Sequence, residues 1–422
     1  MTSILHALYL TAFLLFGFPS CDDVDSGTIH DNLPDISGYP IVSTNQTKCF
    51  NDYHEIAAPV PGEPFYGQDA QYPGNLSRYL DNGDSTITDR VTGLMWEQAQ
   101  SKMLWKDAES NAANAGTGGY SDWRVPTIKE LYSLIDFTGN QGTGDPSSLT
   151  PPPDAKPFIN TDYFAFEYPS AGRYIDVQMI SKTTYLGTAI GNEETFFGLN
   201  LADGRIKAYP HRGNLSSPEF AARFVRGNEN YGINSFQDNG DGTITDLATG
   251  LMWCKYDSGD ETFAGTLSGY SYTDGSMNWE EALHFSENAT FAGYGDWRLP
   301  DAKELHSILD YSRSPDATDS PAIDPVFETT GITNEAGEED FPAFWSSTTF
   351  EPGRDAVIIF FGRAMGYFDP YDPMHNSHPI FLDVHGAGCQ RTDPKSGTPD
   401  YGHGPQGDVR RVYNYVRLVR NP

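Results

Sequence analysis

The chain has 422 residues, of which 38% are hydrophobic and 13% aromatic, so it carries enough apolar surface to fold as two or three domains. Asp and Glu number 58 against 27 Lys and Arg, and the net charge of −31 repels phosphate backbones and anionic membranes. This composition excludes nucleic acid as a general partner, unless a local basic patch overrides the average. The 42 Gly and 29 Pro residues indicate many turns and short strands, and they disfavour an all-helical fold.

Residues 1–20 have the character of a signal peptide, because they lack Asp, Glu, Lys and Arg and contain an apolar run from Ile4 to Phe18. The run ends just before Cys21, and the small Ser20 preceding it resembles a bacterial lipoprotein cleavage site. Cys21 would then be the lipidated first residue, with ordinary cleavage beside it as the alternative. We therefore expect an exported protein, secreted or held in the cell envelope, that touches a membrane only through this lipid anchor.

An internal repeat organises the rest of the chain. The string DNGDSTITD at 81–89 returns as DNGDGTITD at 238–246, and TGLMW at 92–96 returns at 249–253. Further on, GYSDWRVP at 119–126 returns as GYGDWRLP at 293–300, and KEL at 129–131 returns at 303–305. We infer two homologous domains, 79–228 and 235–420, each with its own core. Residues 21–78 are interpreted as an extended N-terminal arm, and 368–411 as a long loop insertion found only in the second domain.

Local patterns predict the elements of each domain. Asn82-Gly83 and Asn239-Gly240 are typical hairpin turns, each followed by an alternating Thr-Ile-Thr strand. Capping-box patterns, in which the first residue caps a helix and a Glu follows three positions later, predict short helices that begin after Thr127, Asn278 and Asp301. The fold class is α+β, with two short helices and short antiparallel strands in each of the two tandem domains.

The order and spacing of DNGDGTITD, TGLMW, GYGDWRLP, KEL, WSSTT and a terminal VRLVR resemble the Lcl C-terminal domain family, named after the Legionella collagen-like adhesin. The resemblance covers nearly all of residues 79–420, once in each of the two domains. It implies a C-type lectin-like fold in which the first and last strands of each domain pair and a long loop region displays the ligand surface. It also implies an exported or surface binding module, in some members an adhesin for sulfated glycans. This chain lacks a collagen-like repeat, and its charge of −31 argues against a sulfated ligand.

The Asp and Asn side chains of the two repeated loops are the best candidates for a cofactor, calcium. Each loop offers hard oxygen ligands within nine residues, which suits the six to eight oxygens that calcium takes. The spacing is not that of an EF-hand, and turn formation is the alternative explanation. The candidate metal ligands are Asp81, Asn82, Asp84, Asp89, Asp238, Asn239, Asp241 and Asp246.

The tryptophans of the repeats are expected in the core rather than on a sugar-binding surface. Trp123 and Trp297 each precede a Pro and a capped helix, and we expect their flanking residues to form the structural pairs Asp122-Arg124 and Asp296-Arg298. The same reasoning places Trp96, Trp105, Trp253 and Trp279 on apolar faces.

The display loops of the second domain carry the more plausible ligand-binding groups, because polar and aromatic side chains concentrate there. The alternative is that the insertion contributes only to packing or to subunit contacts. The candidate ligand-binding residues are Trp345, Ser346, Arg363, His385, Arg391, Asp393, Lys395 and His403.

No catalytic residue is predicted, since the chain contains neither a GxSxG elbow nor an HExxH helix. Cys49, Cys254 and Cys389 allow at most one disulfide, and Cys254 with Cys389 is favoured because both lie in the second half. We expect an adhesin-like or lectin-like binding protein for a carbohydrate or a protein ligand, with oligomer formation possible. A structural envelope protein that self-associates is the alternative, and an oxidase-like enzyme using Cys254 or Cys389 is the third reading.

Overall fold

The computed structural model describes residues 38–72, 74–191, 193–211, 218–372 and 375–422. The predicted signal peptide and the lipidation site at Cys21 lie outside these residues. The described part consists mostly of β-sheet with a few short helices, and it contains no helix long and apolar enough to span a membrane.

Each domain begins with an antiparallel sheet in which the last strand of the domain pairs with the strand of the TGLMW motif. The first sheet has the order β11-β5-β4-β3 and the second β12-β13-β14-β24. The first sheet contains β3 (Tyr79–Asp81), β4 (Thr86–Asp89), β5 (Leu94–Glu97) and β11 (Val225–Gly227). The second contains β12 (Phe236–Asp238), β13 (Thr243–Asp246), β14 (Met252–Asp257) and β24 (Arg417–Arg420). The predicted hairpins are confirmed. The expected pairing of the first with the last strand of each domain is wrong, because β3 and β11, like β12 and β24, lie at opposite edges of their sheets.

The helices are short, and the three predicted capping boxes are all formed. Thr127 caps α2 (Ile128–Ser133), Asn278 caps α3 (Trp279–Asn288) and Asp301 caps α4 (Ala302–Ser307), each with a Glu at the third helical position. The remaining helices are α1 (Ala108–Ala113), α5 (Pro315–Thr318) and the 3-10 turns η1 (Asp69–Gln71), η2 (Trp105–Asp107), η3 (Thr117–Gly119) and η4 (Glu261–Thr266).

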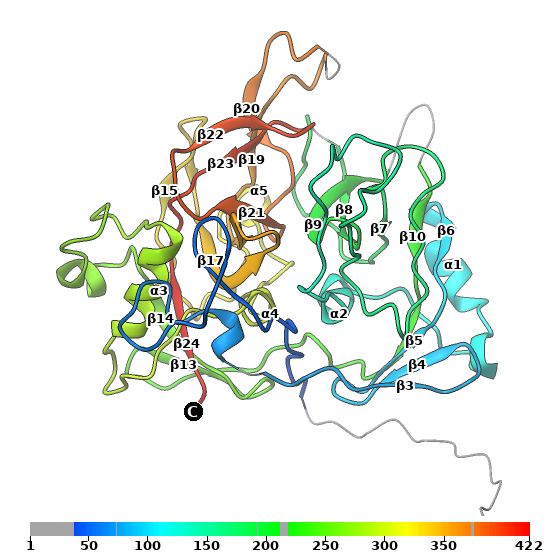
Figure 1. Cartoon of the computed structure of the whole chain (residues 1–422), viewed down its shortest axis with the longest axis horizontal. Coiled ribbons are helices and arrows are strands. Elements are labelled where there is room, and N and C mark those ends of the chain that lie inside the picture. Colours follow the sequence, from blue (N-terminus) through cyan, green and yellow to red (C-terminus); the bar gives the residue numbers. More distant parts are fainter. Residues whose placement is uncertain (1–37, 73, 192, 212–217, 373–374) are drawn as a thin grey trace, which may run out of the picture. The chain divides into compact units, whose positions relative to one another are not determined.

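An eight-stranded sheet runs through both domains in the order β17-β18-β21-β9-β8-β7-β10-β6 (Figure 1). The two halves meet where Gln390 of β21 pairs with Ile206 of β9. The second domain contributes β17 (Ala343–Phe350), β18 (Asp355–Phe360) and β21 (Gln390–Pro394). The first contributes β6 (Ser101–Met103), β7 (Gln178–Met179), β8 (Thr195–Asn200), β9 (Arg205–Pro210) and β10 (Phe220–Ala222).

The insertion at 368–411 is therefore not a free display loop, which corrects the expectation from its Gly and Pro content. Its strand β21 lies between β18 and β9 in the large sheet. The insertion also completes a four-stranded sheet of β19 (Met365–Phe368), β20 (Ile380–Asp383), β22 (Asp400–His403) and β23 (Asp408–Arg410). Two small hairpins remain, β1 (Cys49–Phe50) with β2 (Glu55–Ile56) and β15 (Ile332–Thr333) with β16 (Glu339–Asp340).

The described part of the predicted arm, from residue 38 onward, packs on the second domain instead of extending away (blue in Figure 1). Tyr39 N donates to Ala248 O at 3.0 Å, and Asp69 of η1 accepts a bond of 2.6 Å from Thr348 in β17. Phe65 packs against Trp279 with ring centroids 6.3 Å apart. The arm precedes the first domain in sequence, yet it covers the second.

Helices α2 and α4 join the two domains through reciprocal lysines of the KEL motifs. Lys129 Nζ donates to Ser307 O at the end of α4 at 2.7 Å, and Lys303 Nζ donates to Ser133 O at the end of α2 at 3.0 Å. Each lysine thereby satisfies a carbonyl that the other helix leaves without a partner at its end. One continuous hydrophobic cluster includes residues of both domains, so the domains are packed together.

Candidate functional site

Most of the predicted ligand-binding residues lie inside the protein, which corrects the prediction that display loops carry them. Their strands β17 and β21 have neighbours on one or both sides, and their side chains turn toward the core. Trp345 donates through Nε1 to Met277 O at 2.8 Å, and Ser346 donates to Val357 O at 2.9 Å. The buried residues are Trp345, Ser346, His385, Arg391, Asp393 and Lys395.

Two of the eight predicted residues remain closer to the surface. Arg363 is partly buried, because its guanidinium pairs with Asp316 at 2.6 Å. His403 is exposed, and together with Arg391 it lines the cavity described below.

The repeated Asp and Asn loops have the hydrogen bonds of turns. Asp81 and Asp238 each accept from the backbone N–H two residues later at 2.8 Å, and Asn82 and Asn239 each bridge two threonines. Asp84 and Asp241 accept from the following Thr, while Asp89 and Asp246 are buried and accept backbone N–H groups. In the described ranges, no group of three or more His, Cys, Asp or Glu side chains could hold a metal ion. Calcium binding by these loops stays a prediction.

The tryptophans are buried as expected, except for the partly buried Trp105, but the Asp-Trp-Arg tripeptides do not form internal ion pairs. Asp122 pairs with Arg226 on the last strand of its domain at 2.6 Å, and Asp296 pairs with Arg420 at 2.8 Å. The arginines of the tripeptides instead bind the capping glutamates, Arg124 with Glu130 and Arg298 with Glu304. Asp122 and Arg124 lie two positions apart and so share a face of the extended segment, but each is bound by another partner, Asp122 by Arg226 and Arg124 by Glu130.

The three described cysteines are free, buried thiols, so the favoured disulfide between Cys254 and Cys389 is not formed. Burial raises the pKa of Cys254 to about 12 and also raises that of Cys389 and Cys49. Because the thiolate is the nucleophile, these environments disfavour thiol chemistry at neutral pH.

A cavity of about 390 Å³ lies where the first domain meets the insertion, beside the β9–β21 junction. Its walls carry cations from both domains, in contrast to the strongly acidic chain. The basic side chains lining it are Arg173, Arg205, Lys207, Arg391 and Arg410, and the acidic ones are Asp145, Asp203 and Asp408. It therefore gathers five of the 27 Lys and Arg residues against three carboxylates.

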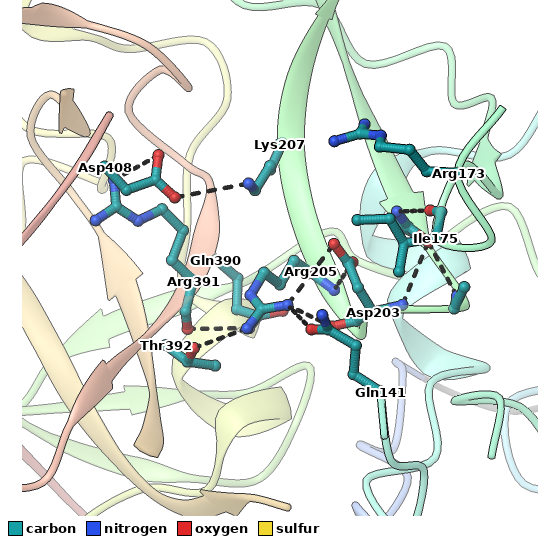
Figure 2. Close-up of polar contacts among 12 residues, drawn as sticks. Gln141, Arg173, Ile175, Asp203, Arg205, Lys207, Gln390, Arg391, Thr392 and Asp408 are labelled. Carbon is teal, nitrogen blue, oxygen red and sulfur yellow. Dashed lines mark hydrogen bonds and ion pairs between the residues drawn. The ribbon is translucent and has the colours of Figure 1, made fainter. Parts of the chain in front are cut away.

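Arg205 spans the junction between the domains (Figure 2). Its Nη1 donates to Gln141 Oε1 at 2.7 Å, and its Nη2 donates to Thr392 Oγ1 of β21 at 3.1 Å. Its guanidinium also lies over the ring of Phe350 at 4.6 Å. These contacts fix one cation at the centre of the site, and both domains supply them.

Asp408 contacts two cations and a histidine in the upper part of the cavity (Figure 2). Its carboxylate lies 3.6 Å from Lys207 Nζ and 3.6 Å from Arg391 Nη1, and 2.8 Å from His385 Nε2. Burial alone would raise the pKa of Asp408, but the charges of Arg391 and Lys207 hold it well below its ordinary value. Burial lowers the pKa of His385 to about 4, so that imidazole is neutral at physiological pH.

Sequence reasoning did not single out Gln141, Arg173, Arg205 or Lys207 as ligand-binding groups. A signal was present in Arg205-Ile206-Lys207, because two cations at alternate positions of a strand face the same side. The partner residues Arg391 and Asp408 come from the insertion, and no local pattern showed that it returns to the first domain.

Comparison with known families matches the chain twice to one domain model. The model is the Lcl C-terminal domain, and it matches residues 85–226 and 242–379, more than half of the chain. No curated protein and no solved structure matches the chain. The second match ends inside the insertion, before β21 and the terminal strand β24. The chain belongs to the Lcl C-terminal domain family.

Proposed function

We propose that this protein is an exported, adhesin-like surface protein that binds an anionic saccharide in the cationic cavity between its domains. The observation that carries the proposal is the concentration of five basic side chains around one cavity in a chain of net charge −31. A field of one sign in a concave site attracts a ligand of the opposite sign, even where the whole protein repels it.

The chemistry of the walls favours a carboxylated or sulfated sugar. Guanidinium groups bind such groups through two parallel hydrogen bonds. Arg173 and Arg410 line the cavity and are partly exposed, and each is already paired with a carboxylate, Asp176 and Asp400, that a ligand would have to share or displace. Gln141, Ser147 and Thr392 supply amide and hydroxyl groups suited to sugar hydroxyls. The ligand would contact both domains, in contrast to the expectation that loops of the second domain bind it alone.

Family membership supports a surface, adhesin-like role. The C-type lectin-like fold is a finer proposal that rests on the family resemblance, since the last strand of each domain pairs with the TGLMW strand and not with the first strand. Attachment through Cys21 completes the proposal, since it would hold the two domains at the cell surface.

The test measures binding of three oligosaccharides of equal length, one sulfated, one built from uronic acids and one neutral. The variant Lys207→Gln with Arg410→Gln removes two cavity cations. Its matched control, Lys102→Gln with Lys106→Gln, removes two exposed lysines of the first domain outside the cavity. Isothermal titration at low and at physiological salt gives the affinity and its ionic-strength dependence.

We expect saturable binding of an acidic oligosaccharide and no binding of the neutral one. The cavity variant should weaken binding by about tenfold or more, which is about 1.4 kcal/mol, and the control should change it by less than about twofold. Equal loss in both variants would mean that only the net charge matters, and it would refute the site.

A further inference from the structure

A second cavity, of about 720 Å³, lies between the first domain, the interdomain linker and the second domain. The first domain contributes Arg124, Thr127, Lys182 and Thr183 to its wall. These residues belong to the repeated motifs, so the second domain contains a counterpart of each one. The counterpart site in the second domain is filled by a segment of this chain, and that segment indicates which chemical groups fit the cavity.

Two backbone hydrogen bonds at this site in the first domain have matches in the second, which indicates that the two sites are equivalent. The first backbone N–H of the helix donates to a threonine hydroxyl, at 3.0 Å for α2 and 2.9 Å for α4. The N–H of the residue before that threonine donates to the carbonyl of the proline before the helix, at 2.9 Å in the first domain and 2.8 Å in the second. The matched bonds are Ile128 to Thr183 with Ala302 to Thr348, and Lys182 to Pro126 with Ser347 to Pro300.

In the second domain this site is filled by η1 of the arm. Asp69 accepts from Thr348 Oγ1 at 2.6 Å, and the ring of Tyr72 lies 5.4 Å from the Arg298 guanidinium. Tyr72 also donates to Glu287 at 2.5 Å. The guest is therefore a single turn that presents a carboxylate, with an aromatic ring three residues later.

Within the described residues, no such turn fills the matching site of the first domain, because the linker is too short to supply one. Tyr39 of the arm and Tyr231 of the linker occupy matching positions before the two domains, and their rings lie 5.0 Å apart. Strand β3 begins at Tyr79, whereas β12 begins at Phe236, so the arm contains a long segment that the linker lacks. That segment includes η1.

The empty cavity is also better suited to a carboxylate than the occupied one. Thr127 stands where the second domain has Asp301, and the exposed Lys182 stands where it has Ser347. Two substitutions at matched positions thus make this wall more positive by two charges. Of the four acidic residues of the cavity, Glu229, Asp310 and Asp324 lie on the linker and the second domain, and Glu130 of the first domain is paired with Arg124. A guest carboxylate therefore belongs beside Lys182 and Thr183.

We propose that this cavity is a docking site for an acidic peptide segment of a partner protein, folded as one turn with an Asp followed three residues later by an aromatic residue. The Asp would accept a hydrogen bond from Thr183 and pair with Lys182, and the aromatic ring would stack on Arg124. Arg124 can receive it, because its side chain is 22% exposed while that of the covered Arg298 is 8% exposed.

The probe is a fluorescent peptide with the sequence of residues 64–75, and its control carries Asp69→Asn. Anisotropy is measured on the full chain and on the variant Thr127→Asp with Lys182→Ser. These substitutions introduce the residues of the second domain, where the same backbone accepts them, so the fold should persist. Lys106→Ser is the control for the lost lysine. The tethered arm keeps the second-domain site filled, since its effective concentration is of millimolar order.

We expect the peptide to bind with a Kd below about 1 mM, and the double variant and the Asn peptide each to weaken it by about tenfold. Lys106→Ser should leave binding unchanged. Absence of saturable binding, or equal binding by the double variant, would overturn the proposal. It would also be overturned if the acidic oligosaccharide, rather than the peptide, bound in a way that depends on Lys182, a result that leaves the cavity at Arg205 untouched.

Discussion

Replacing Trp345 tests whether this residue belongs to the core or to a ligand surface. Its side chain is fully buried in β17, and its Nε1 donates to Met277 O at 2.8 Å. Trp345→Ala removes the ring and the hydrogen bond together. Trp345→Phe keeps most of the apolar surface and removes only the N–H.

The expected cost follows from the area that leaves the core. A buried Trp removes about 250 Å² from water, and at about 25 cal/mol per Å² this gives an upper limit of about 6 kcal/mol. Trp→Ala substitutions in cores cost about 3–5 kcal/mol, so we expect that range for Trp345→Ala. Trp345→Phe removes one of the two hydrogen bonds that Met277 O accepts, since Asn414 N also donates to it at 3.0 Å, and this loss should cost about 0.5–1.5 kcal/mol.

Urea unfolding followed by circular dichroism measures both losses as changes in the free energy of unfolding. Trp345→Phe should also bind ligand as well as the unchanged protein, because the ring lies away from the surface. A Trp345→Ala variant that kept its stability to within about 0.5 kcal/mol and lost ligand binding would refute the buried placement.

Three further predictions concern pH, metal and a buried arginine. Burial raises the pKa of Asp383 to about 7, so the folded state binds a proton that the unfolded state has lost, and stability falls as pH rises from 4 toward 7. Relative to Asp383→Asn, the unchanged protein should lose up to about 4 kcal/mol between pH 4 and 8 in urea unfolding, and parallel curves would contradict this. If the Asp and Asn loops bind calcium as predicted, the Tm should be higher in millimolar calcium than in EDTA, because a ligand of the native state alone raises stability. Equal Tm values would mean that these carboxylates only form turns. The guanidinium of Arg417 donates to Lys255 O and Glu328 O, both at 2.8 Å. Arg417→Lys should lower the free energy of unfolding by about 2–4 kcal/mol, because one ammonium group cannot reach both carbonyls. A loss below about 0.5 kcal/mol by calorimetry would show that the two guanidinium hydrogen bonds are dispensable.

The features that could be predicted from the sequence are those set by residues a few positions apart. The hairpins at Asn82 and Asn239 and the capping boxes at Thr127 and Asp301 follow from backbone chemistry within a few positions. The repeat then established two domains, because each string recurs in the same order. The core tryptophans followed from the apolar strands and helices that carry them.

The site could not be predicted in the same way, because its residues meet only through distant pairings. Gln390 joins Ile206 across the domain boundary, and this single pairing brings Arg391 beside Lys207 and Asp408. Likewise, Asp122 is satisfied by Arg226, more than a hundred positions away, rather than by Arg124. The polar residues of the Gly-rich insertion predicted an exposed loop, but the pairing of β21 with β18 and β9 buries them.

Hydrogen–deuterium exchange with and without an acidic oligosaccharide tests the central claim most directly, because it locates the ligand on the full chain. Two segments outside the strands contribute residues to the cavity wall, 141–147 and 404–407. The account predicts slower exchange in both segments together when the sulfated or uronic-acid ligand is added, and no change with the neutral one. Protection confined to one domain, or located away from these segments, would contradict a ligand held between the two domains.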